Sequence, residues 1–309
     1  MHGRGRRRAV AAALALAVAA ALAPATPTSA AVPTVRCSDL TANSGGAVRW
    51  QRIDADLLVD DETCYLVDVG VHGDVTIPPG GRLGISRTSI HGDIASSGVL
   101  STSASTVDGD ITTSWPSDAP GYVDLEETNV KGGLSGSSGA YALYGTSVAG
   151  PVDVTATYFV SVVHAHLGAS LTVRAENDID VAWSTVTGDL TLAGPTTHSL
   201  GLCTSTVGGD LSVSGSGSGS ATDPGSGHSP GPGSGSASAG TVRLAVDQYQ
   251  VRCSSTVAGS VHLTGNDGDV TIGRLFVKGD LTCTGNTGPA GVVVLRTASI
   301  RGTRSGQCA

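Results

Sequence analysis

A short motif returns along most of the chain and limits the folds that the chain can adopt. The string STVTGDLTL at Ser184–Leu192 recurs as STVGGDLSV from Ser205, as STVAGSVHL from Ser255 and as TSIHGDIAS from Thr88. The glycine of each copy marks a position that returns about every 20 residues. We call these the anchor glycines: Gly73, Gly92, Gly109, Gly132, Gly150, Gly168, Gly188, Gly209, Gly259, Gly279 and Gly302.

One interval breaks the period. Gly209 and Gly259 are 50 residues apart, and between them lies a stretch of 27 residues, 214–240, composed mostly of Gly, Ser and Pro. Without that stretch the interval is 50 − 27 = 23 residues, close to the others. We therefore expect 214–240 to be a disordered insertion within one repeat, with a composition typical of flexible linkers.

A repeat of this length is typical of one coil of a parallel β-solenoid, in which each coil stacks its strands on those of the previous coil. Hydrophobicity alternates within the motif, since Val186, Leu190 and Leu192 fall on one side of a strand and Asp189 on the other. We predict an all-β chain that folds as a single-stranded parallel β-helix of about eleven coils of about 20 residues, with right-handed coiling by analogy with crossover connections. An antiparallel β-sandwich is the alternative, although it does not require one motif in one register.

The N-terminal residues have the pattern of a secretory signal. Four arginines at positions 4–8 precede an Ala/Leu/Val run from Ala9 to Ala23, and small residues surround Ala30. We expect a signal peptide over 1–30, an N-terminal cap with the first strands over 31–67, and the β-helix over 68–309. No second apolar run of spanning length follows. The mature chain is therefore expected to be secreted, extracellular and without a membrane span.

The net charge of the chain without its signal limits the classes of molecule that it could bind. Subtracting the four arginines of the signal leaves 18 − 4 = 14 basic residues against 26 acidic ones, a net charge of 14 − 26 = −12. General electrostatics then disfavour nucleic acid and acidic polymers as partners. We expect a monomer whose partner is a polysaccharide or protein of the cell envelope or its surroundings.

The chain has six cysteines, all after the signal, and an even number in an exported chain predicts disulfides. Cys203 and Cys253 each precede an anchor glycine by six residues, so they should occupy one position of adjacent coils. Stacked Cα atoms about 4.8 Å apart suit a disulfide. The other predicted pairs, one toward each end of the solenoid, are Cys283 with Cys308 and Cys37 with Cys64.

The chain resembles a group of bacterial secreted β-helix proteins without an assigned function. The resemblance lies in IDADLLVDDETCYLVDVGVHGDVTIPPGGRL near the start, in the V-x-G-D-L units, and in VKGDLTCTGN with TASIRGTRSGQC at the end. It implies a right-handed parallel β-helix and no chemistry. A weaker similarity is to bactofilins, cytoplasmic or membrane-associated polymers with G-D-I-like repeats, from which the expected signal peptide and disulfide-linked ends set this chain apart.

Aspartates follow six of the anchor glycines and would form a ladder along the solenoid. We call them the Asp ladder: Asp74, Asp93, Asp110, Asp189, Asp210 and Asp280. Carboxylates at stacked positions could serve a polysaccharide-cleaving enzyme, because the spacing of such a ladder includes the spacings that glycosidases use. The interpretation we favour is that each aspartate accepts backbone hydrogen bonds at a bend.

The first three coils carry a possible metal site. Imidazole nitrogen with carboxylate oxygen suits zinc, and the carboxylates alone suit calcium. The residues are His72, His91 and Asp108, before the anchor glycines, and Asp74, Asp93 and Asp110, after them. Solvated turn residues are the favoured alternative, and no other cofactor is expected. His164 and His166 form a second histidine pair, which needs a third converging ligand to hold a metal.

Aromatic residues gather in the middle of the chain and could bind a sugar. Tyr141 and Phe159 each lie nine residues before an anchor glycine, which predicts that they stack on adjacent coils. With Trp183 they are the candidate ligand-binding residues, and packing in the core or at corners is the alternative. The favoured function is a non-catalytic extracellular structural or interaction module. The alternative is a polysaccharide-active enzyme or carbohydrate-binding protein that uses the Asp ladder or these aromatics.

Overall fold

The computed structural model describes residues 32–42, 46–60, 63–115, 121–194, 199–215, 241–246 and 252–309. Contacts divide the chain into two units, Met1–Val32 and Pro33–Ala309. The expected signal peptide over 1–30 lies outside the described residues. Within the described part, no helix is long and apolar enough to cross a membrane.

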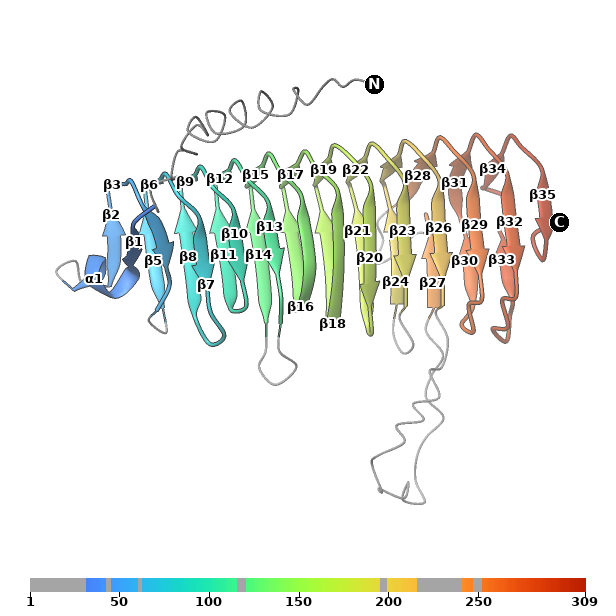
Figure 1. Cartoon of the computed structure of the whole chain (residues 1–309). Coiled ribbons are helices and arrows are strands. Elements are labelled where there is room, and N and C mark those ends of the chain that lie inside the picture. Colours follow the sequence, from blue (N-terminus) through green and yellow to red (C-terminus); the bar gives the residue numbers. More distant parts are fainter. Residues whose placement is uncertain are drawn as a thin grey trace, which may run out of the picture. The chain divides into compact units, whose positions relative to one another are not determined.

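The unit Pro33–Ala309 consists of strands that form three ladders, and Figure 1 shows its turns following one another from α1 (Cys37–Thr41) to the C-terminal end. We call the three sides first, second and third face.

The first face comprises β1 (Thr34–Arg36), β4 (Asp56–Leu58), β7 (Val75–Ile77), β10 (Ile94–Ser96), β13 (Ile111–Thr113), the first halves of β16 (Leu134–Tyr144) and β18 (Val152–Val163), β20 (Leu171–Ala175), β23 (Leu190–Ala193), β26 (Leu211–Ser214), β29 (Val261–Thr264), β32 (Leu281–Thr284) and β35 (Arg304–Gly306). The second face comprises β2 (Ala47–Arg49), β5 (Cys64–Val67), β8 (Arg82–Ser86), β11 (Val99–Ser103), β14 (Tyr122–Glu126), the second halves of β16 and β18, β21 (Asp178–Ala182), β24 (Ser199–Cys203), β27 (Thr241–Leu244), β30 (Val270–Ile272) and β33 (Val292–Val294). The third face comprises β3 (Arg52–Ile53), β6 (Gly70–Val71), β9 (Ser89–Ile90), β12 (Thr106–Val107), β15 (Asn129–Val130), β17 (Ser147–Val148), β19 (His166–Leu167), β22 (Thr185–Val186), β25 (Thr206–Val207), β28 (Ser254–Val257), β31 (Arg274–Val277) and β34 (Ser299–Ile300).

Neighbouring strands in each ladder are parallel and come from successive turns. Ile94 of β10, for example, pairs in register with Val75 of β7 on one side and with Ile111 of β13 on the other. The structure is therefore an all-β parallel β-solenoid of about 12 turns, which confirms the predicted fold class. The glycine count gave about eleven because one earlier turn has Ala55 in place of the anchor glycine, followed by Asp56, which contacts Asp74 as the members of the Asp ladder contact the next turn.

The register corrects one assignment of the repeat. Leu167 pairs with Val148 and Val186, and the N–H of Gly188 donates to the carbonyl of Ala169. Ala169, not Gly168, therefore occupies the anchor position of its turn. Gly168 lies one residue earlier, where its N–H donates to the carbonyl of Val148.

Rows of β-branched and leucine side chains from all three faces fill the interior. Val186, Leu190 and Leu192, the residues that the alternation assigned to one side of the strand, are fully buried. Equivalent positions in the next turn hold Val207 and Leu211, also fully buried. Branched side chains suit this role because they pack well on a pleated surface.

All three predicted disulfides are present. Cys203 and Cys253 have Cα atoms 4.8 Å apart, the spacing expected of stacked strands. Cys37–Cys64 links α1 to β5 near the N-terminal end, and Cys283–Cys308 links β32 to the last residues of the chain.

The insertion begins slightly later than expected. Ser214 is the last residue of β26, paired with Ala193 and Thr264, and β27 begins at Thr241. The rest of the predicted insertion, from 216 to 240, lies outside the described residues, so its disorder stays a prediction.

Candidate functional surface

The Asp ladder bonds to the main chain of the neighbouring turn. The Oδ1 atom of Asp74 accepts the N–H of Asp93 at 2.8 Å, and that of Asp93 accepts the N–H of Asp110 at 2.8 Å. The other aspartates of the row make the same contact with the equivalent residue of the next turn: Asp56 with Asp74, Asp110 with Gly133, Asp189 with Asp210, Asp210 with Ser260 and Asp280 with Thr303. This geometry is the backbone-acceptor arrangement favoured from the sequence.

The same contact explains the glycine of the motif. A Cβ on Gly109 would overlap the Oδ1 atom of Asp93 and would lie 2.7 Å from the carbonyl oxygen of Gly92. Each aspartate thus occupies the space beside the anchor position of the following turn, and only a residue without a side chain fits there. Where Ala169 replaces the glycine, the preceding turn has Pro151 instead of an aspartate.

The six candidate metal ligands form two rows. In one row the rings of His72 and His91 lie 4.3 Å apart between centroids, His91 Nδ1 lies 2.7 Å from Asp108 Oδ2, and Lys131 Nζ lies 2.7 Å from Asp108 Oδ1. Hydrogen bonds from Lys131 and then His91 lower the pKa of Asp108. The other row holds Asp74, Asp93 and Asp110, whose Oδ1 atoms accept backbone hydrogen bonds.

These rows do not fit the proposed metal site well. Across the described ranges, no three His, Cys, Asp or Glu side chains are grouped in an arrangement that could hold a metal ion. Lys131, which sequence reasoning did not include, competes with a metal for the Asp108 carboxylate. Metal binding by these residues stays a prediction, testable by calorimetric titration with zinc and calcium.

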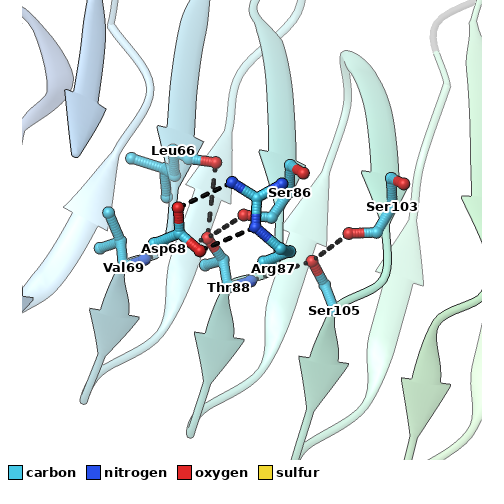
Figure 2. A network of polar contacts seen from close by, with 8 residues as sticks. All are labelled: Leu66, Asp68, Val69, Ser86, Arg87, Thr88, Ser103 and Ser105. Carbon is cyan, nitrogen blue, oxygen red and sulfur yellow. Dashed lines mark hydrogen bonds and ion pairs between the residues drawn. The ribbon is translucent and has the colours of Figure 1, made fainter. Parts of the chain in front are cut away.

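A corner between the second and third faces explains the Ser/Thr of the motif. Non-glycine residues there adopt the left-handed backbone region, for example Asp68 with φ 56° and Arg87 with φ 49°. Figure 2 shows the bidentate ion pair between these two side chains, with both hydrogen bonds at 2.8 Å. The hydrogen bond from Arg87 lowers the pKa of Asp68.

The residue after each corner is in most turns a buried serine or threonine. Thr88 Oγ1 donates to the carbonyl of Ser86 at 3.1 Å, and the Thr88 N–H donates to Ser105 Oγ of the next turn at 3.2 Å (Figure 2). The buried hydroxyl therefore satisfies main-chain groups that the tight corner leaves without a ladder partner. The members of this row are Thr88, Ser105, Thr128, Thr146, Ser184, Ser205 and Ser255.

The predicted stacking of Tyr141 on Phe159 is wrong. Tyr141 is fully buried and pairs with Val123 and Val160, whereas Phe159 pairs with Ala140 and is exposed. Counting from Gly168 instead of Ala169 shifted Phe159 by one residue, and a shift of one residue moves a side chain to the other face of a strand. Burial raises the pKa of Tyr141 to about 12, and its hydroxyl lies 2.5 Å from Thr113 Oγ1.

Five rings of the middle turns lie on the outer side of the second face and at its corner, in two groups: Tyr122 with Phe159, and Tyr144 with His164 and Trp183. We call these five residues the aromatic face. Phe159 lies beside Tyr122, with ring centroids 6.4 Å apart. Trp183 stacks on His164 at 5.3 Å with an interplanar angle of 17°, and Tyr144 meets His164 edge-on at 5.6 Å. His164 and Trp183 occupy the left-handed corner of successive turns, so their rings stack at the repeat distance.

This corner also separates the second histidine pair. His164 lies at the corner and His166 in β19, beyond the turn. The two histidines therefore do not lie on one strand, whereas a shared metal site required that they do.

Carboxylates lie between the aromatic rings. Asp124 and Asp180 occupy one outward row of the second face, in which Ala142 and Ser161 separate them. Burial and then the nearby Glu126 raise the pKa of Asp124. Desolvation by neighbouring atoms raises the pKa of Asp180, a residue that is exposed by surface area.

Such a surface can bind molecules that combine apolar faces with hydroxyl groups. The rings offer apolar area at low entropic cost, and the carboxylates accept hydrogen bonds. Asp124 and Asp180 are three turns apart, about 14 Å at the usual strand spacing. That separation exceeds the roughly 5–9.5 Å between the two carboxylates of a glycosidase.

A groove of about 350 Å³ lies at the opposite edge of this region, where the first and second faces meet. Trp115, Ser138, Thr155 and Glu176 are among its lining residues. Sequence reasoning missed it, because neither the turn widths nor the register of β16 and β18 could be read from the motif. The only sequence signal was the run from Val152 to Val163, which lacks the usual Gly or Pro break between two strands.

A scan against models of protein families, a search of curated proteins and a search of solved structures each gave no match to the chain. The resemblance to β-helix proteins is supported by the structure alone, and at the level of the fold, a β-solenoid.

Proposed function

We propose that this chain is a secreted, non-catalytic β-solenoid of a bacterium that acts as an extracellular interaction module. The observation that carries the proposal is a division of roles among side chains. Residues that repeat from turn to turn fill the core or bond to the main chain, as Asp93 and Ser184 do. The aromatic face belongs to a few middle turns and serves no repeated structural contact.

Cysteine usage supports export. All six cysteines form disulfides, and there is no free cysteine among the described residues. Such complete pairing is typical of proteins that fold in an oxidising compartment. The arginines and apolar run at the N-terminus, and the resemblance to bacterial secreted β-helix proteins, point in the same direction.

Export is tested by expressing the whole chain in a bacterium and alkylating the cell fractions. We expect protein outside the cytoplasm with all six cysteines protected from alkylation. Recovery only from the cytoplasm, with reactive thiols, would contradict the proposal.

Binding is tested by co-sedimentation of the purified, oxidised protein with insoluble cell-envelope polysaccharide. Trp183→Ala should lower the bound fraction, and Trp50→Ala is the matched control. Trp50 occupies the same left-handed corner in an early turn and is likewise exposed. Equal binding by the two variants would exclude the aromatic face.

A polysaccharide-cleaving enzyme is the second candidate, and one observation favours it. Asp178 and Asp180 lie two residues apart on β21, about 6.6 Å along the strand, within the range of catalytic carboxylate pairs. Asp178 Oδ1 accepts the N–H of Ser199 at 2.9 Å, whereas desolvation by neighbouring atoms raises the pKa of Asp180, the direction that a general acid requires. Release of reducing ends that Asp180→Asn abolishes would establish this alternative in place of the first.

A further inference from the structure

The groove between the first and second faces has a floor of small side chains. Ser138, Ala156 and Ala175 are register partners in three successive turns, and Gly194 lines the groove in the next. These residues leave an opening at a corner of the solenoid whose volume, about 350 Å³, lies within the range of small-molecule sites.

A bulge shapes this part of the wall. The pairing of β16 with β18 shifts between Ser138 and Ala140, because β18 has one residue more than β16 at this point. Thr157 and Tyr158 therefore lie opposite the single residue Gly139. Bulges of this kind are frequent beside binding and active sites, where they redirect side chains.

Ser138 has a polar atom that the fold leaves unsatisfied. Its side chain is 3% exposed, and among the described residues its Oγ is the buried side-chain polar atom without a hydrogen-bond partner. Such a group costs free energy unless something bonds to it. Because Ser138 lines the groove, a rotation about its Cα–Cβ bond would bring the Oγ to a bound molecule.

The remaining walls supply one aromatic ring and several polar groups. The indole of Trp115 lies against the backbone of Gly121, where a Cβ would overlap the ring. Thr155 and Thr157 contribute hydroxyls, and Glu176 contributes a carboxylate.

The charged side chains of the groove indicate whether its ligand is neutral or anionic. Arg174 also lines the groove, but its Nη1 lies 2.7 Å from Asp153 Oδ1, so its positive charge is already compensated. Glu176 adds a negative charge. A ligand with an anionic group would therefore meet no uncompensated cation in the groove, whereas hydroxyl groups find both donors and acceptors.

We propose that this groove binds a sugar ring of a neutral polysaccharide, with Trp115 against the ring and Ser138, Thr155, Thr157 and Glu176 on its hydroxyls. The proposal deepens the function proposed above and depends on it. It also explains the position of the aromatic face: Thr157 lines the groove, and the exposed rings of Tyr158 and Phe159 follow it on β18. Further rings of the same polymer can then lie on the aromatic face.

The number of tryptophans permits a specific probe. The chain has three, so Trp50→Phe with Trp183→Phe leaves Trp115 as the single tryptophan. We expect at least one of cellohexaose, laminarihexaose and mannohexaose to change the emission of this variant and to bind the unaltered protein in calorimetry. Polygalacturonate, as the anionic comparison, should bind more weakly.

Substitutions of groove residues test whether the hexaose binds in the groove. Trp115→Ala should weaken binding of the hexaose at least about tenfold, which is about 1.4 kcal/mol. Ser138→Ala should weaken it by a smaller factor without lowering the melting temperature, since the hydroxyl has no partner in the fold. Thr157→Tyr, an exposed position, should block the groove if Trp115→Ala fails to fold, and Trp50→Ala should bind normally.

Three results would overturn the proposal: no binding of any of the neutral hexaoses, tighter binding of polygalacturonate, or unchanged binding by Trp115→Ala and Thr157→Tyr. Binding that Trp183→Ala abolishes but Trp115→Ala leaves intact would reject the groove and keep the interaction module. Failure of the export test would reject the module itself, whatever the groove binds in the test tube.

Discussion

Replacing Asp93 separates the structural account of the Asp ladder from any role of its charge. Asp93→Ala removes the Oδ1 acceptor that lies 2.8 Å from the N–H of Asp110. Asp93→Asn removes the charge but keeps an oxygen in the same place. Gly109→Ala keeps the carboxylate and places a Cβ where it would overlap Asp93 Oδ1, 2.7 Å from the carbonyl oxygen of Gly92.

The structure gives the expected order of effects. Loss of one exposed side-chain acceptor for a backbone N–H costs about 1 kcal/mol, as for helix caps. In a unit of this size that lowers the melting temperature by about 2 °C. Asp93→Asn should cost less than about 0.5 kcal/mol, within the range of surface substitutions. Gly109→Ala should cost about 3 kcal/mol or more, because backbone must move as in an overpacked core.

The assay is thermal and chemical unfolding of the three variants, with the double variant Asp93→Ala, Gly109→Ala as the control. The double variant should remain strongly destabilised, because removing the carboxylate leaves the overlap with the main chain of Gly92. Equal destabilisation by Asp93→Asn and Asp93→Ala would show that the negative charge matters, which would revive the metal interpretation. Stability of Gly109→Ala equal to the unaltered protein would refute the account of the motif.

Three further predictions concern other elements. Cys203→Ser with Cys253→Ser should lower the free energy of unfolding by about 4 kcal/mol on the chain-entropy model for a separation of 50 residues, measured by denaturant titration; a loss below about 1 kcal/mol would contradict this. Ser184→Ala should cost about 1–3 kcal/mol because the N–H of Ala165 loses its acceptor, whereas Ser184→Thr should be nearly neutral; equal melting temperatures for both would refute it. The folded-state pKa of Asp124 is raised, so its ionised form costs stability above that pKa and nothing below the unfolded value of 3.8. Asp124→Asn should therefore raise the melting temperature at pH 7 and leave it unchanged near pH 3, and a gain at both would exclude titration as the cause.

The architecture could be predicted because one period governs it. A motif that returns every 20 residues specifies stacking, alternation specifies which side chains face inward, and stacking brings Cys203 and Cys253 together. Even the function of the Gly-Asp pair followed from turn chemistry, although the contact of each aspartate with the glycine of the next turn requires the register between turns.

The binding surface was harder to predict because it depends on departures from the period. Because Ala169 and not Gly168 holds the anchor position, Phe159 lies on the outer side of its strand, while Tyr141 faces the core. The bulge between β16 and β18 depends on one additional residue in β18, which no local pattern marks. His164 beside Trp183 could have been noticed, since both lie at one position of successive turns, but the left-handed corner that aligns their rings is visible only in the structure.

Hydrogen–deuterium exchange of the oxidised protein, with and without a polysaccharide that it binds, tests the central claim most directly. Amides exchange more slowly where a bound polymer covers them or restrains the local opening of their turn. We predict protection confined to peptides between Trp115 and Cys203, which include the groove and the aromatic face, with exchange elsewhere unchanged. Protection along the Asp ladder of the first turns, or none at the aromatic face, would contradict the claim that the middle turns form the binding surface.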